Sequence, residues 1–153
     1  MIDKEINVKS IFQLYFTLLI LAFPLQTHAA TEQEYLEFFN KNIELSNAYD
    51  ISSVDMYSDD ALIQIQETLS DGTNTTTKIS GSKLKELTIK NIELTRKSGV
   101  KTQAENISIS IEGNKAKVTA TTYNNLNCFK SDKFYMILEK QANGDIKIRY
   151  MTS

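Results

Sequence analysis

Two spacings of apolar residues alternate along this chain, and they divide it into helical and extended segments. Over residues 32–48, apolar side chains recur every three or four positions, after a Thr31 that can cap a helix together with Glu34. This spacing predicts an amphipathic helix, and a short second helical turn is expected through residues 56 and 57. The inward face of the long helix would consist of Tyr35, Phe38, Phe39, Asn42, Ile43 and Leu45.

The middle of the chain predicts a hairpin followed by another long helix. Residues 61–69 alternate in polarity, the dipeptide Asp71-Gly72 is a strong turn signal, and residues 73–79 are rich in β-branched threonine. The apolar spacing becomes helical again over 83–98.

From residue 107 onward the spacing has a period of two, which predicts strands. The expected strands are 107–111, 116–129, 134–140 and 146–150. Three asparagines between Asn124 and Asn127 interrupt the second of them and predict a bulge or a loop. Helices followed by three or four antiparallel strands indicate an α+β domain with a curved sheet.

The first thirty residues differ from the rest and are typical of a cleavable export signal. An apolar run over 11–25 is too short for a stable membrane span, and Thr27-His28-Ala29-Ala30 supplies small residues for cleavage. We therefore expect a signal peptide over 1–30, a single domain over 31–153, and a periplasmic or secreted location in a bacterium. The alternative is an uncleaved anchor, which would hold the domain at a membrane.

The composition of the chain limits the partners and the kinds of functional site that can be expected. The chain has 17 basic and 19 acidic residues, a net charge of −2 and no basic stripe, so we expect no nucleic-acid partner. His28 is the single histidine and would leave with the signal, which excludes histidine-based metal sites and catalytic triads from the domain. We expect no metal and no cofactor. Cys128 is the single cysteine, either a small buried hydrophobe or a link between two chains.

Several local patterns resemble the NTF2-like superfamily, which includes SnoaL-like and ketosteroid-isomerase-like domains. They are the aromatic pair Phe38-Phe39, the segment MYSDDA at 56–61, the Asp71-Gly72 hairpin, and the segment IEGNKAKV at 111–118. The resemblance covers essentially all of 31–153. It implies a cone in which a curved antiparallel sheet wraps around about three helices, and it says almost nothing about function.

The resemblance also implies a pocket between the first helix and the concave face of the sheet. The alternative is a cone filled by the same side chains. The residues expected to face the pocket are Phe38, Tyr57, Leu62, Tyr123, Phe134, Met136 and Tyr150. An enzyme resembling ketosteroid isomerase would need only a carboxylate and a tyrosine in an apolar cavity. Asp60 or Asp132 could be that base, and Tyr57, Tyr123 or Tyr150 the hydrogen-bond donor, although none matches the subfamily residue by residue.

We expect a non-catalytic binding or protein-interaction domain, and if the cone is open its pocket would take a small apolar ligand. Self-association through the sheet is also expected, because the outward strand positions Thr119, Thr121, Tyr135 and Ile137 mix β-branched and aromatic side chains. Two alternatives remain open. One is an enzyme of the SnoaL or ketosteroid-isomerase kind, and the other is a component of an envelope secretion machine that keeps its N-terminal segment.

Overall fold

The computed structural model describes residues 30–68, 71–125 and 129–152. The expected signal segment up to residue 29 and Cys128 therefore lie outside the described residues. None of the helices in the described ranges combines the length and hydropathy that crossing a membrane requires. In chain order the elements are α2 (Glu32–Ala48), the 3₁₀ helix η1 (Ile51–Met56), β1 (Tyr57–Thr68), β2 (Asn74–Ser80), α3 (Gly81–Ser98), β3 (Thr102–Glu112), β4 (Lys115–Asn124), β5 (Phe129–Lys140) and β6 (Ile146–Thr152).

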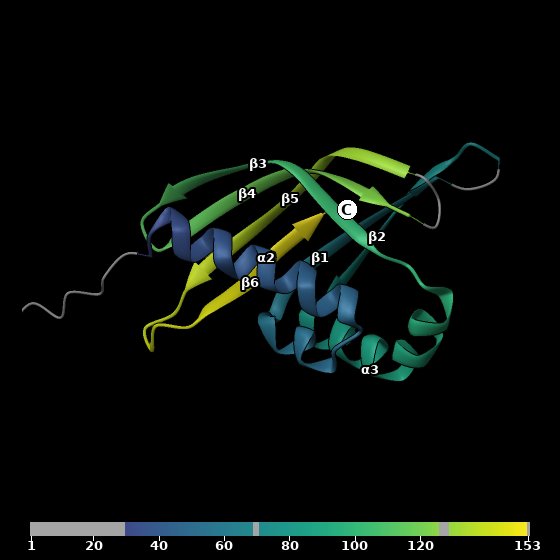
Figure 1. Ribbon diagram of the computed structural model, residues 1–153, viewed down its shortest axis with the longest axis horizontal. Helices are drawn as coiled ribbons and strands as arrows, with labels where there is room; N and C mark the ends of the chain where they lie inside the picture. The colour runs from purple at the N-terminus through teal and green to yellow at the C-terminus, as the bar shows by residue number, and fades with distance from the viewer. Residues whose placement is uncertain (1–29, 69–70, 126–128, 153) are drawn as a thin grey trace, which may run out of the picture.

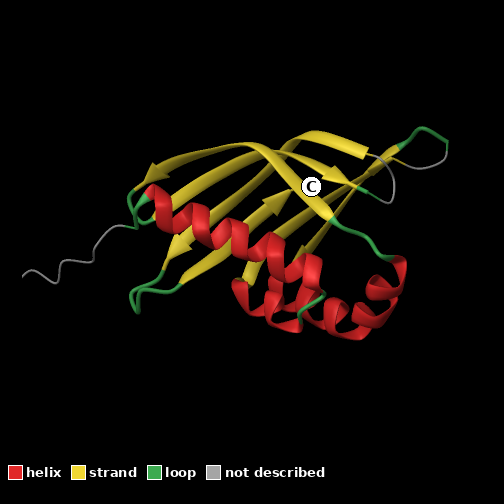
Figure 2. Cartoon of the chain, in the orientation of Figure 1, coloured by secondary structure: helices red, strands yellow, loops and turns green. Residues whose placement is uncertain are grey.

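The strands form one curved sheet in the order β2-β1-β6-β5-β4-β3, with both long helices packed on its concave face (Figures 1 and 2). The α+β class and the cone are confirmed. One neighbouring pair departs from the expected antiparallel pattern, because β1 and β6 run parallel. The strands β2 and β3 run in the same direction because α3 carries the chain back between them. Three hairpin reversals then leave β6 parallel to β1.

The helix α2 begins at the capping box that the sequence predicts. The Thr31 hydroxyl accepts from the backbone N–H of Glu34, and the Glu34 carboxylate accepts from the backbone N–H of Thr31, which completes a capping box. Tyr35 and Phe39 are fully buried. The Tyr35 hydroxyl donates to the carbonyl of Asn114 at 2.7 Å and so ties α2 to the β3–β4 turn.

The helix α3 is held at its first residue by a close backbone approach. Ser80 caps the helix through the N–H of Lys83, so α3 begins two residues before the predicted start. A Cβ at Gly81 would lie 1.9 Å from the carbonyl oxygen of Ser58. Only glycine therefore lets α3 approach β1 this closely.

Two strand boundaries differ from the prediction. The chain becomes extended already at Tyr57, so β1 begins four residues before the expected start and the short helix ends at Met56. The strand predicted over 116–129 ends at Asn124, and Phe129 already belongs to β5. The amide-rich stretch thus ends the strand, as its composition suggested, although residues 126–128 lie outside the described part.

Alternation along the strands separates a buried face from an outer face. The buried core is formed by the inward residues of four neighbouring strands and by the aromatic face of α2, where Phe39 and Phe134 meet with ring centroids 6.0 Å apart. The fully buried strand residues include Ile63, Val118, Met136, Leu138 and Ile148. This core closes the cone on the side of the β3–β4 turn and leaves space on the other side.

Candidate ligand-binding cavity

A cavity of about 350 Å³ lies between α2 and the concave face of β4, β5 and β6. The core does not fill the cone at this place, because the inward side chains of the sheet are followed by shorter polar ones near the end of β4. We call this space the cone cavity. It is lined by Asn42, Ile43, Ser46, Tyr57, Gln66, Thr102, Thr122, Tyr123, Asn124, Ser131, Phe134, Met136 and Met151.

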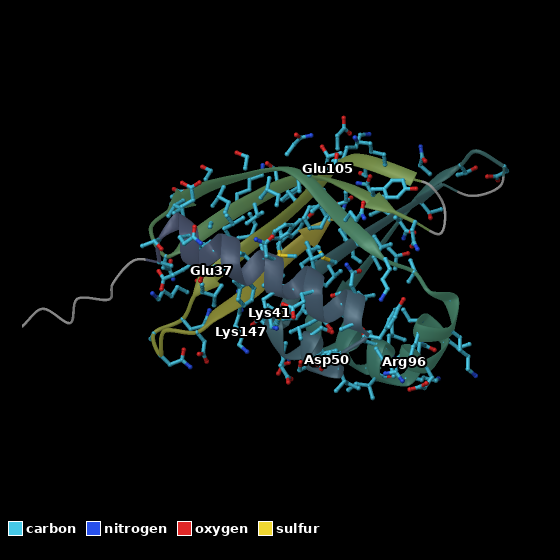
Figure 3. The ribbon with its side chains drawn as sticks, viewed as in Figure 1. Glu37, Lys41, Asp50, Arg96, Glu105 and Lys147 are labelled. Atoms are coloured by element: carbon cyan, nitrogen blue, oxygen red, sulfur yellow. The ribbon has the colours of Figure 1, made fainter. Side chains whose placement is uncertain are left out.

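None of the described residues that line the cone cavity carries a charge. Apolar side chains such as Phe134 and Met136 stand beside hydroxyls and amides. The charged residues labelled in Figure 3, among them Lys41 and Glu105, do not line this space. Burying an ion without a partner is costly, so the cavity suits a neutral molecule.

Tyr57 is a buried polar group in the lining, with 9% of its surface exposed. Burial raises its pKa from 10.0 to about 12, opposed in part by a hydrogen bond with the side chain of Asn42. The Tyr57 hydroxyl lies 3.6 Å from the sulfur of Met151, to which it donates. At neutral pH Tyr57 is therefore an uncharged donor with a weak acceptor.

Asn42 repeats this arrangement on α2. It is only 4% exposed, and its Nδ2 lies 3.6 Å from the sulfur of Met56. A thioether sulfur is a poor acceptor compared with an oxygen atom. Tyr57 and Asn42 thus bring two buried donors together at one point of the cavity wall. A ligand oxygen placed there would give both donors a stronger acceptor.

Four of the seven residues expected to face a pocket do line the cone cavity, namely Tyr57, Tyr123, Phe134 and Met136. Phe38 is half-buried and packs against the core without lining the cavity. That these residues bind a ligand stays a prediction.

Leu62 and Tyr150 lie on the opposite face of the sheet, so the expectation that they face the cone is wrong. They are register partners in β1 and β6, and Leu62 is 41% exposed. The register between β5 and β6 shifts at Arg149, so the alternation of β6 inverts there. Met151, not Tyr150, therefore continues the inner face after Ile148.

The two carboxylates considered as a catalytic base lie away from the cavity. Asp60 accepts from the Ser58 hydroxyl at 2.6 Å and from both terminal nitrogens of Arg149. These hydrogen bonds, with Ser58 first and Arg149 second, hold the pKa of Asp60 below its ordinary value. Asp132 is exposed and does not line the cavity. Neither residue is part of the lining that surrounds Tyr57 in the cone cavity.

Sequence reasoning missed Asn42 and Met151 as lining residues. Asn42 could have been singled out, because it is the polar member of an otherwise apolar helix face. Met151 could not, because the inversion at Arg149 leaves no trace in the polarity pattern.

Another hollow lies on the polar side of the molecule, where Lys85 pairs with Asp59 at 2.6 Å. It is open and solvated. In the described ranges, no three acidic, histidine or cysteine side chains gather as a metal site would require.

No family model and no curated protein sequence matches the chain, so the comparison rests on solved structures. An NTF2-like protein of unknown function from Pseudomonas putida KT2440 superposes with a TM-score of 0.61 at 11% identity, over 79% of this chain and 83% of that one. An NTF2-like protein with a cystatin-like fold from Novosphingobium aromaticivorans gives 0.54 at 11% identity, over 99% and 90%.

The yeast UBP3-associated protein BRE5 gives a TM-score of 0.57 at 14% identity, over 81% of this chain and 95% of that one. Identities this low carry no information about function. The agreement of element order, sheet curvature and coverage shows that this chain has the NTF2-like fold.

Proposed function

We propose that this chain is a non-catalytic binding domain, which holds a small, neutral and largely apolar molecule in the cone cavity. The observation that supports it best is the pairing of Tyr57 and Asn42, two buried polar side chains that hydrogen-bond to each other and otherwise donate to thioether sulfurs. A neutral ligand with one oxygen acceptor would take the place of these sulfurs, and its apolar part would lie against Phe134 and Met136.

The absence of a carboxylate from the described lining favours binding over an enzyme of the ketosteroid-isomerase kind. A general base must come within hydrogen-bond reach of the proton that it removes. Asp60 is engaged by Arg149, and Asp132 does not line the cavity. Tyr57 alone can orient a carbonyl group but cannot remove a proton at neutral pH.

A titration with the neutral dye 1-N-phenylnaphthylamine tests this proposal. We expect a saturable rise in fluorescence with one dye per chain. Thr122→Trp should fill part of the cavity and weaken binding by about tenfold or more. Thr119→Trp is the matched control, because Thr119 lies on the same strand and pairs with Tyr135 of the outer face. Equal binding by the two variants, or no saturable binding to the wild type, would refute the proposal.

The outer face of the sheet supports self-association as a second role. Leu62, Ile137 and Tyr150 are neighbours there, and Tyr135 stacks on Tyr150 with ring centroids 5.1 Å apart. We call these four residues the outer-face cluster. Both long helices lie on the other side of the sheet (Figure 2). A second copy of the chain would cover an apolar surface of this kind.

The proposal also sets the domain outside the cytoplasm, in the periplasm or secreted, because of the apolar run over 11–25. Ala30 is packed in the core, which favours cleavage after Ala29 over cleavage after Ala30. N-terminal sequencing of the protein from the cell envelope tests this. A retained segment would favour the alternative, an anchored component of a secretion machine.

A further inference from the structure

A second cavity, of about 320 Å³, lies between α3 and the segment formed by the end of α2 and by η1. We call it the α3 groove. None of its described lining residues is charged. The apolar part of its wall is formed by Leu84, Leu87 and Ile92 of α3, which face Tyr49 and Val54.

The cone cavity and the α3 groove share a wall. Ser46, Tyr57 and Met151 line both of them. Two of these residues meet through the hydrogen bond from the Tyr57 hydroxyl to the Met151 sulfur, 3.6 Å away. Met151 is only half-buried, and a methionine side chain is unbranched and changes rotamer easily. The contact between Tyr57 and Met151, two side chains that line both cavities, is therefore part of the partition between them.

The helix α3 is seated loosely over its groove. Among its eighteen described residues only Gly81 is buried, and Leu84, Leu87 and Ile92 remain half-buried. The helix is anchored at its start by the approach of Gly81 to Ser58. Such a helix can accommodate a guest beneath its apolar face with little loss of packing.

We propose that the two cavities form one binding site for a neutral ester with two apolar arms, whose oxygen takes the place of Met151 as the acceptor for Tyr57. This inference rests on the proposed function and extends it. The donor Tyr57 lies at the junction, and Asn42 lines the cone cavity beside it, so an acceptor in the middle of the ligand suits the site. One arm would then enter the cone cavity, and the other would pass Met151 into the α3 groove.

Two isomeric esters test the proposal by calorimetric titration of the full-length protein. Pentyl hexanoate has two arms of similar length, whereas methyl decanoate has one long arm, and both have the formula C11H22O2. We expect pentyl hexanoate to bind about tenfold more tightly, because roughly two more methylenes are buried when both cavities are occupied.

Leu87→Trp should abolish this preference by filling the α3 groove. Ile89→Trp should keep it, because Ile89 lies on the same helix but is 54% exposed. Equal affinity for both isomers in the wild type would overturn the inference and leave the proposed function standing. A preference that persists in Leu87→Trp would also overturn it. Failure of both esters and of the dye to bind would refute the proposed function itself.

Discussion

The hydroxyl of Tyr57 donates its hydrogen bond to the sulfur of Met151, across 3.6 Å from the start of β1 to the end of β6. A weak acceptor in this place has a consequence for stability. Tyr57→Phe should lower the free energy of unfolding at pH 7 by less than about 1 kcal/mol, because little hydrogen-bond energy is lost. The same variant should bind an ester more weakly, because an ester has the oxygen to which Tyr57 would donate. Urea unfolding and a ligand titration of the two proteins measure both effects.

Alkaline pH gives a further test of Tyr57. Its pKa is raised from 10.0 to about 12 by burial, so its stabilising effect is complete below pH 10 and is lost as the pH rises through 12. The wild type should lose at most about 3 kcal/mol from this group in that range. Tyr57→Phe lacks the group and should show the shallower decline. An equal decline of the free energy of unfolding in both proteins between pH 10.0 and about 12, measured by urea unfolding, would contradict the assignment.

Gly81 should be irreplaceable. A Cβ at this position would lie 1.9 Å from the Ser58 carbonyl oxygen and 3.2 Å from the Cβ of Ala61. Gly81→Ala should therefore destabilise the protein by about 2 kcal/mol or more, because backbone must move. Gly99→Ala serves as the comparison, since Gly99 has a φ of +66° and open space around it. It should cost about 1 kcal/mol. Thermal or urea unfolding that ranks the two variants the other way would show that α3 is not anchored at Gly81.

Asp60 should affect the stability of the folded protein at acid pH, but it should not affect ligand binding. Its lowered pKa means that its stabilising effect is present above the unfolded value and is lost as the pH falls through the folded one. Asp60→Asn should flatten the decline of stability below about pH 4, the ordinary range of a carboxyl group. At neutral pH both Asp60→Asn and Asp132→Asn should bind the dye as the wild type does. Loss of binding in either variant would show that the substituted carboxylate takes part in ligand binding.

The outer-face cluster predicts a concentration-dependent dimer. Ile137→Glu would place a charge beside Tyr150, its register partner, and should give a monomer in sedimentation velocity experiments. Thr77→Glu on β2, where the side chain is exposed, should leave the dimer intact. A wild-type protein that stays monomeric at high micromolar concentration would rule out association through this face.

The helices could be predicted because their signals are local. Thr31 and Glu34 form the expected capping box, and Gly99 adopts the left-handed conformation at the end of α3. Alternation also identified the inner face of β4 correctly, where Ala116 and Val118 are buried. Each of these features depends on residues no more than four positions apart, which is why a single sequence was sufficient.

The remaining features depend on long-range pairing. The parallel pairing of β1 with β6 joins the two ends of the domain, and no turn signal in the sequence predicts it. The register shift at Arg149 inverts the alternation of inward and outward side chains in the last part of β6. As a result, Met151 lines the site and Tyr150 does not. The hollow beside Asn42 depends on how side chains of six elements fail to fill the cone, and no polarity pattern in the sequence predicts this.

The most direct test of the central claim uses the methionine methyl groups as reporters. The sequence has four methionines; Met136 and Met151 line the cone cavity, and Met56 accepts from Asn42. In ¹³C-methyl spectra assigned by Met→Leu variants, 1-N-phenylnaphthylamine should shift the signals of Met136 and Met151 in the wild type and leave them in place in Thr122→Trp. Dye binding with unchanged Met136 and Met151 signals would mean that the ligand lies elsewhere, and would contradict the account.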